Sequence, residues 1–378
     1  MDRNRRFSRR RVLTSLGAAG VLGIAGCSSQ SQSGDGESGD GGSGDGSGSG
    51  GSDEQLPGSD TWIGIVYPIP GLGDKAFADS AHRGLLRAVD DMGVRFEQAE
   101  PTSSDEFPVF FQRFASSTNP DFDLVIGMTF SHRAALESKS KQFPDQRFAI
   151  IDTVLDRPNV GSYVFREHEC CYLAGYLSAA ISDQGMSAGA GETNDNKIIG
   201  YVGGERTPVN VRFEAGYKEG MLAYDDSFEL LVTYAGTYNE PSKGRSIANS
   251  MFDNGADIVF PAAGGTSIGV PKAAQESERY ALGVDTDMSV TAPEFSDVII
   301  ASVVKKTGPA TYSAIEDVVK GNYSPDVGSL GLKEDGLELV YGQDLGSAVP
   351  EDLKSTISSR REQIVNEDLE VPDKPEEV

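Results

Sequence analysis

A glycine turn, an acidic side chain and a lysine mark the part of this sequence best suited to hold a small polar molecule. Residues 257–262 form a short apolar run typical of a buried parallel strand, and Gly264 lies at the turn that follows it. Asp285 follows the next apolar run, 280–284, and Lys305 lies near the end of the one after it. In open α/β sheets, ligands bind beyond the carboxyl ends of the strands. These three side chains are therefore expected at a binding site.

Other predicted strands are followed by polar or aromatic residues that a hydrophobic core would not favour. Asp74 and Lys75 come after the first predicted strand, and Asp152 ends the third. Phe77 and Phe213 lie in the segments that follow two strand ends. Taken singly, an acid could cap a helix and a phenylalanine could belong to the core. Their shared position at strand ends favours a binding site.

A regular alternation of strands and helices places these residues. Strands are predicted at 61–67, 124–127, 147–152, 159–165, 197–203, 230–234, 257–262 and 280–284, and helices at 73–91, 131–142, 172–182, 210–224, 242–254 and 270–277. Such alternation predicts an α/β protein with parallel sheets and right-handed crossovers. The number of strands favours two doubly wound lobes over one sheet.

An enzyme is the main alternative class, and the sequence argues against it. Gly265 to Gly269 matches the G-x-S-x-G turn of hydrolases, with Ser267 as the nucleophile. That family needs a histidine after the serine in the chain, whereas His82, His132 and His168 all precede it. We therefore expect no catalytic residue, and the serine motif is interpreted as a tight turn.

The cysteines and histidines do not predict a metal site. His168 to Cys171 reads His-Glu-Cys-Cys, but neighbouring residues on a helix point in different directions and do not converge on one ion. A disulfide between the adjacent Cys170 and Cys171 would be strained. We expect structural burial for this segment, and neither a metal nor another cofactor, because phosphate-binding and zinc motifs are also missing from the sequence.

The N-terminus resembles an export signal for a lipoprotein. Residues 1–26 hold six arginines and one aspartate, and their apolar run is short for a membrane span. Residues 8–13 resemble a twin-arginine signal, and residues 23–27 resemble a lipobox in which Cys27 receives the lipid. A frayed basic helix is the alternative. Residues 27–59 are rich in Gly, Ser and acids, which predicts a disordered tether to the outer face of the cell membrane.

The charge balance limits the possible partners. The chain carries a formal net charge of −25, and removal of the basic residues 1–26 would leave −30. Such an acidic surface disfavours nucleic acids as partners. It fits a protein that stays soluble in concentrated salt, as in halophiles, where charges are strongly screened.

Short motifs along residues 61–365 follow one known family in order. They are Gly73–Phe77, Asp123–Gly127, Phe148–Asp152, Asn159–Phe165, Tyr172–Leu177, Gly200–Gly204, Phe213–Tyr217, Gly255–Phe260, Ala262–Thr266, Gly283–Asp287 and Ser302–Lys305. The sequence resembles the basic membrane protein (BMP, PnrA-like) family of ABC-transporter substrate-binding lipoproteins. The resemblance implies a type I periplasmic-binding-protein fold, in which two Rossmann-like lobes close across a hinge. We expect 60–166 with 288–321 in the first lobe, 167–287 with 322–365 in the second, and 366–378 as an acidic tail.

Many members of that family bind purine nucleosides, which implies roles for eight residues here. It implies that Asp74, Lys75 and Phe77 line the first lobe's side of the cleft and that Asp152 lies toward the hinge. Phe213 would face Phe77 across the base, and Gly264, Asp285 and Lys305 would hold the ribose. Stacking contributes about 1–3 kcal/mol per contact, and a carboxylate with an ammonium can bind vicinal hydroxyls. Ala78 stands where the family often has Asn, which leaves the identity of the base open.

The resemblance also implies the partners. The closed, ligand-bound form would dock on an ABC permease that has its own ATPase, and we expect the protein itself to be a monomer without catalytic activity. Two other interpretations stay open at this point. The same fold could bind a sugar or another small polar molecule, or it could act as a membrane-tethered sensor without a transporter.

Overall fold

The computed structural model describes residues 56–69 and 71–377. The predicted export signal, the predicted lipidation site Cys27 and nearly all of the predicted tether lie outside the described residues. The predictions made for them therefore stay predictions.

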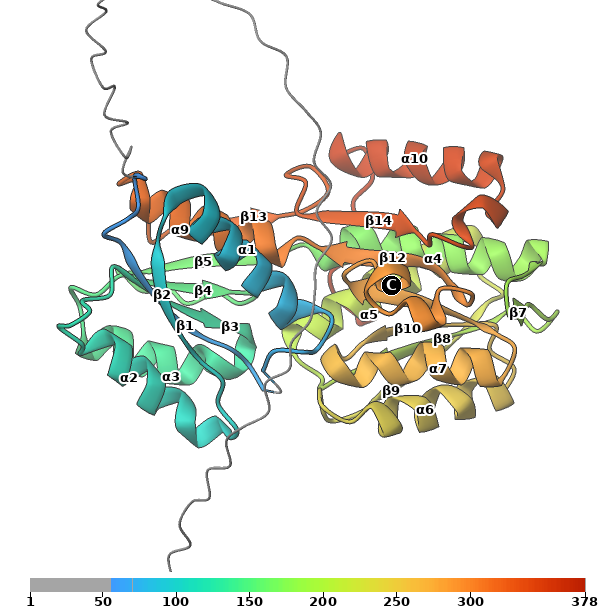
Figure 1. The fold of residues 1–378 in the computed structure, drawn as a ribbon. Coiled ribbons are helices and arrows are strands. Elements are labelled where there is room, and N and C mark those ends of the chain that lie inside the picture. Colours follow the sequence, from blue (N-terminus) through green and yellow to red (C-terminus); the bar gives the residue numbers. More distant parts are fainter. Residues whose placement is uncertain (1–55, 70, 378) are drawn as a thin grey trace, which may run out of the picture. The chain divides into compact units, whose positions relative to one another are not determined.

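The first of two six-stranded sheets has all of its strands parallel, in the order β13-β5-β4-β3-β1-β2. Its strands are β1 (Trp62–Val66), β2 (Arg95–Ala99), β3 (Leu124–Met128), β4 (Phe148–Ile151), β5 (Val160–Phe165) and β13 (Val327–Leu330). Helices α1 (Phe77–Met92) and α9 (Thr307–Val319) pack together, as do α2 (Phe107–Ala115) and α3 (Thr129–Gln142). We call this sheet and its helices the first lobe (Figure 1).

The second sheet has the order β14-β12-β11-β10-β8-β9, and only its edge strand β14 runs antiparallel to its neighbour. Its strands are β8 (Ile198–Gly203), β9 (Glu229–Tyr234), β10 (Ile258–Ala262), β11 (Tyr280–Asp285), β12 (Ile299–Lys305) and β14 (Leu337–Tyr341). Its helices are α4 (Glu167–Gln184), α5 (Pro208–Tyr224), α6 (Pro241–Asp253), α7 (Gly269–Glu276), α8 (Met288–Thr291) and α10 (Glu351–Val365). We call this sheet and its helices the second lobe; a small hairpin of β6 (Ser187–Ala188) and β7 (Gly191–Glu192) accompanies it.

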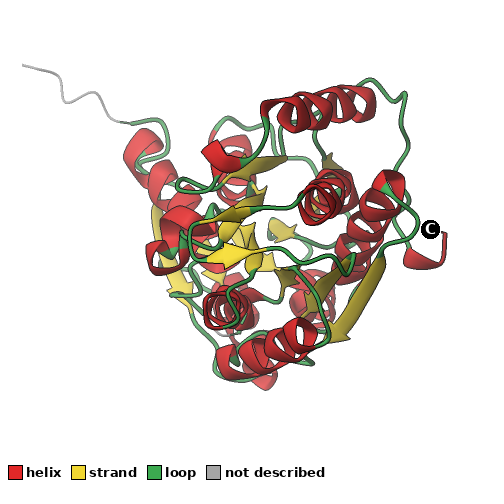
Figure 2. Ribbon diagram, turned by 90° about the vertical axis from the view of Figure 1, so that its right-hand side faces the viewer, coloured by secondary structure: helices red, strands yellow, loops and turns green. Residues whose placement is uncertain are grey.

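Both sheets are covered on both faces, which explains their apolar strands. In β1, Ile63 and Ile65 belong to the cluster that contains α1 and α9, whereas Val66 belongs to the cluster that contains α2. The large cluster continues through α4 and α5 of the second lobe, and a smaller one lies under α6 and α7. Figure 2 shows the strands in the interior with helices around them. This α/β architecture confirms the predicted fold class.

The chain passes between the lobes three times, and only the first crossing lies where we expected it. The crossings follow β5 at Arg166, follow β12 at Lys306, and join β13 to β14 through residues 331–336. Strand pairing therefore corrects the assignment of 288–306 to the first lobe, because β12 pairs with β11 and β14 of the second sheet. The rest of that segment, α9, packs on α1 in the first lobe as expected. It also places β13, which we expected in the second lobe, beside β5 in the first sheet. The short α8 carries the chain from β11 to β12 within one sheet.

Two further parts of the chain differ from expectation. The sequence named no element between 92 and 123, where the structure has β2 and α2, because the partly exposed β2 lacks an apolar run. The predicted acidic tail packs against the second lobe. Val371 is buried, and the Lys218 ammonium donates a hydrogen bond to the carbonyl of Pro375.

Helices α4 and α5 approach closely because glycines face the partner helix. A Cβ atom on Gly175 would lie 2.0 Å from the carbonyl oxygen of Tyr217, and one on Gly220 would lie 1.9 Å from that of Tyr172. No real contact is that short, so any larger residue must separate the helices. This interface supports the helix that begins at the hinge, and its spacing therefore bears on the cleft.

We predict that Gly220→Ala lowers the free energy of unfolding by about 1–3 kcal/mol, the usual cost of overpacking. Gly328→Ala is the matched control, since the nearest atom to its Cβ would be an ordinary 3.7 Å away. Urea unfolding of both variants at constant salt measures the difference. Equal stabilities for the two variants would contradict the tight α4–α5 interface.

Candidate functional site

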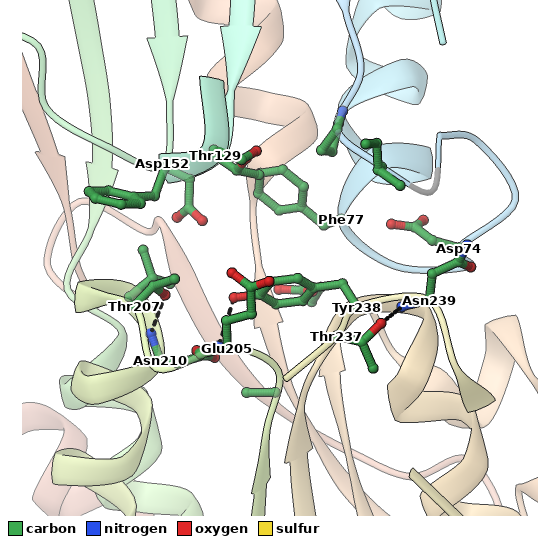
Figure 3. A pocket seen from close by; sticks show the side chains of 18 of the residues that line it. Asp74, Phe77, Thr129, Asp152, Glu205, Thr207, Asn210, Thr237, Tyr238 and Asn239 are labelled. Carbon is green, nitrogen blue, oxygen red and sulfur yellow. Dashed lines mark hydrogen bonds between the residues drawn. The ribbon is translucent and has the colours of Figure 1, made fainter. Parts of the chain in front are cut away.

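A cavity of about 410 Å³ lies between the two lobes at the carboxyl ends of their strands. This volume is within the usual range for small-molecule sites. Seven of the eight predicted site residues line it: Asp74, Phe77, Asp152, Phe213, Gly264, Asp285 and Lys305. Figure 3 shows labelled side chains from both lobes around it, with Phe77 and Asp152 on one side and Tyr238 and Asn210 on the other.

Lys305, the last residue of β12, lies at the junction of the lobes and is 2% exposed. Its Nζ is 2.8 Å from an Asp152 carboxylate oxygen at the end of β4 and 3.3 Å from a Glu167 oxygen at the start of α4. Glu167 also accepts a hydrogen bond from the Arg212 guanidinium at 2.7 Å. A lysine next to the second crossing thus bridges the two lobes through a buried carboxylate of each.

Three aromatic rings surround the same ammonium. The centroids of Phe77, Phe165 and Phe213 lie 5.2, 5.4 and 5.3 Å from Lys305 Nζ. Rings at such distances attract a cation through their quadrupoles. The positions of Phe77 and Phe213 are therefore tied to the lysine as well as to the cavity.

Burial and charge shift the ionisation of the acids in opposite directions. Burial raises the pKa of Asp285 to about 6 and that of Asp152 to about 7, and the nearby Lys305 only partly offsets it. Burial also acts to raise the pKa of Glu167, but Lys305 and Arg212 outweigh it and hold that pKa below its usual value. For Lys305, burial is outweighed by Asp152 and Glu167, so its pKa is raised and it stays charged at neutral pH.

Several strand ends at the cavity hold a residue in a left-handed backbone conformation. Thr129, Asp152 and Asp285 have φ of 63°, 74° and 61°. Such conformations are uncommon outside glycine and cluster at functional sites, where the surrounding fold maintains them. Aspartate tolerates them better than most residues, which suits it to turn sharply at a strand end.

Asp74 serves as a helix cap and also lines the cavity. Its carboxylate accepts hydrogen bonds from the backbone N–H groups of Ala76, Ala78 and Asp79 at 2.9, 2.8 and 3.2 Å. These bonds satisfy donors at the start of α1, which have no partner within the helix. The capping interpretation thus holds for Asp74, and the same residue lines the cavity.

Lys75 is the predicted site residue that the structure places outside the cavity lining. Its ammonium lies 3.2 Å from Glu294, and its carbonyl accepts a hydrogen bond from the Thr286 hydroxyl at 2.9 Å. Both partners belong to the second lobe, so Lys75 connects the two lobes. Its left-handed backbone, with φ of 56°, directs the chain that way.

The sequence missed the second-lobe wall of the cavity, which we define as Glu205, Thr207, Asn210, Thr237, Tyr238 and Asn239. These residues follow β8 and β9 directly. The rule that ligands bind beyond the carboxyl ends of strands, which selected the other site residues, applies equally to these six. The position of residues 204–210 and 235–239 directly after predicted strands was therefore enough to include them in the predicted site.

The two sites considered as alternatives are both buried in the structure. The Ser267 hydroxyl accepts a hydrogen bond from the backbone N–H of Ala263 within a tight turn. Cys170 and Cys171 lie in α4 with no exposure, and burial raises the pKa of each thiol. Among the residues with a described position, no group of three or more His, Cys, Asp and Glu side chains could hold a metal ion.

Comparison with solved structures identifies the class of protein. An ABC transporter solute-binding protein from Aeropyrum pernix matches with a TM-score of 0.72 and 25% identity, over 82% of this chain and 94% of that one. Together with the interlobe cavity, this match defines a solute-binding protein with the type I periplasmic-binding fold.

The family follows from the sequence. The model for PnrA-like ABC transporter substrate-binding proteins matches residues 64–375, so the chain belongs to this family, whose members are substrate-binding proteins and not enzymes. A nucleoside-binding protein of an ABC transporter from Lactococcus lactis is 26% identical over 96% of this chain and 98% of its own. An uncharacterised lipoprotein from Pyrococcus furiosus is 28% identical over 83% and 82%. Over the part of the chain with described structure, no helix is both long and apolar enough to cross a membrane.

We predict that Glu167→Gln lowers the free energy of unfolding by about 3–5 kcal/mol, because it leaves buried cations without their carboxylate. Glu137→Gln is the control, since Glu137 forms an exposed pair with Lys141 on α3 and its loss should change little. Thermal unfolding of both variants at one salt concentration provides the measurement. A Glu167→Gln protein as stable as the control would show that the buried cluster is not structural.

Proposed function

We propose that this protein captures a ribonucleoside, with a purine base favoured, and delivers it to the permease of an ABC importer. The observation that carries the proposal is the joint lining of one interlobe cavity by aromatic rings and by a carboxylate beside an ammonium. Phe77 offers a ring to a base, while Asp285 and Lys305 can accept from and donate to ribose hydroxyls. The name of the Lactococcus relative supports the same class of ligand.

The charges of the cavity favour a neutral ligand. Asp74, Asp152, Glu205 and Asp285 contribute carboxylates, and Lys305 is the one basic side chain among the described residues of the lining. Its ammonium is already paired with Asp152 and Glu167. A phosphate group would therefore meet more negative charge than positive in a partly desolvated site. A nucleoside fits this balance and a nucleotide does not.

Capture and delivery follow from the division of the site between the lobes. A ligand bound on one lobe gains the contacts of the other only when the hinge closes, so binding shifts the population toward the closed form. A permease that prefers the closed form would then accept loaded protein. Export and lipidation at Cys27 would keep this cycle at the outer face of the membrane, and the lipoprotein name of the Pyrococcus relative supports such an anchor.

Titration calorimetry of residues 56–378 in high salt tests the proposal with adenosine, guanosine, inosine, uridine, ribose and the matching 5′-monophosphates. We predict tight binding of a nucleoside, affinity at least ~100-fold weaker for its monophosphate, and loss of binding in Asp285→Ala. Phe77→Ala should lose about 1–3 kcal/mol of binding free energy. Binding of ribose alone would favour a sugar ligand, and a folded protein that binds none of the compounds would overturn the proposal.

The proposal also predicts a pH dependence. Because burial raises the pKa of Asp285 to about 6, its carboxylate takes up a proton as the pH falls from 7.5 to 5. The protonated group accepts fewer hydrogen bonds, so nucleoside affinity should decrease through this range. Asp285→Asn should bind weakly at every pH and lack the component with a midpoint near 6.

Stability supplies the control for that experiment. The pKa of Asp285 in the folded protein is raised above the usual 3.8, so its ionised form destabilises the fold. This destabilisation is complete above about pH 6 and absent below about pH 4. Asp285→Asn, which also tolerates a positive φ, should therefore raise the unfolding midpoint at pH 7.5 but not at pH 4. Affinity that stays constant in the wild type from pH 8 to 5 would contradict the role of this carboxylate.

A further inference from the structure

Glu205 is a cavity carboxylate that the fold itself does not use. Asp74 caps α1 and Asp152 pairs with Lys305, while Asp285 is the carboxylate proposed for the ribose. Among the residues whose positions the structure describes, none forms an ion pair or a hydrogen bond with the Glu205 carboxylate. Figure 3 shows this side chain on the second-lobe side of the cavity, directed at the open space. Its acceptors are therefore available to a ligand.

The backbone of Glu205 is held in place, although its side chain is not. Its carbonyl accepts hydrogen bonds from the N–H of Thr207 at 2.8 Å and from the side-chain amide of Asn210 at 2.7 Å. Asn210 is buried, and the Thr207 hydroxyl caps α5 by accepting from the Asn210 N–H. The start of α5 thus fixes where the exposed Glu205 side chain leaves the chain, which defines the region of the cavity that its carboxylate reaches.

The order of the strands places Glu205 away from the proposed ribose position. Asp285 and Lys305 end β11 and β12, whereas Glu205 follows β8, and β10 lies between β8 and β11. Neighbouring strands are about 4.8 Å apart, so the ends of β8 and β11 are roughly 10 Å apart across the sheet. A nucleoside with its ribose at β11 and β12 would extend its base toward β8. The base edge farthest from the sugar would then meet Glu205.

The hydrogen-bonding groups of the purines differ at that edge. An ionised carboxylate can only accept hydrogen bonds. Guanine offers it two adjacent donors, N1–H and the 2-amino group, which match the two carboxylate oxygens; hypoxanthine offers N1–H alone. Adenine has an acceptor at N1, so the carboxylate would lose water without a full replacement, which is costly for a charged group.

We propose that Glu205 binds the Watson–Crick edge of the base and makes the cleft selective for guanosine over adenosine. This inference rests on the proposed nucleoside function and names the base that the site prefers. Glu205 is then a residue that determines specificity, separate from the groups that hold the ribose.

The test is titration calorimetry of the wild type and Glu205→Gln with guanosine, inosine and adenosine. The wild type should bind guanosine about 10- to 100-fold more tightly than adenosine, the range for one hydrogen bond to a charged group, with inosine between them. Glu205→Gln should weaken guanosine binding and strengthen adenosine binding, because a carboxamide can donate to adenine N1 and accept from its 6-amino group. A merely structural role would move all three affinities in the same direction.

Glu229→Gln is the matched control. It removes the same charge from an exposed residue of β9 that does not line the cavity, so the ratio of guanosine to adenosine affinity should stay as in the wild type. A wild type that binds adenosine as tightly as guanosine, or an unchanged ratio in Glu205→Gln, would overturn the role of Glu205 and leave the nucleoside function standing. A folded wild type that binds no nucleoside would overturn the proposed function and this inference together.

Discussion

The buried Lys305 ammonium is the interaction on which the arrangement of the two lobes depends. It ends the last parallel strand of the second sheet, at the point where the chain crosses to the first lobe, and it pairs with Asp152 of that lobe. An unpaired ammonium in this place would be very costly, so Asp152 and Glu167 must be close to it. Three phenylalanine rings complete its surroundings.

The acidity of the cavity comes from carboxylates beyond this cluster. Asp152 and Glu167 balance Lys305 and Arg212, so the excess negative charge comes from Asp74, Glu205 and Asp285. Burial, which Lys305 only partly offsets, raises the pKa values of Asp152 and Asp285. A second contact between the lobes joins the Lys75 ammonium to Glu294 at 3.2 Å. The two lobes are thus joined by a buried ion cluster beside the crossings and by an exposed ion pair.

Much of the fold could be predicted because parallel strands that are buried on both faces leave uniform apolar runs. The same regularity explains why seven residues chosen for their positions near strand ends line one cavity. The lobe boundaries could not be obtained in this way. Whether β12 joins the first or the second sheet depends on lateral pairing with β11, and a local pattern of residues does not contain that information.

Physical reasons also explain why some elements and residues were missed or misplaced from the sequence alone. Strand β2 mixes polar and apolar residues because it is an edge strand, so it gives no apolar run. Lys75 was expected in the cavity from its neighbours Asp74 and Phe77, but its left-handed backbone directs it to the other lobe. Tyr238 lies in the loop after β9, and its ring packs against Gly204, which is far from it in sequence.

The central claim is that the cleft selects an uncharged ribonucleoside. The most direct measurement is competitive retention: the protein is mixed with equimolar nucleosides, nucleotides and sugars, separated from free ligand by gel filtration, and its bound molecules are identified by mass spectrometry. The predicted result is retention of one or a few nucleosides and none of their phosphates. Retention of a sugar or a nucleotide, or of nothing by a folded protein, would contradict the claim.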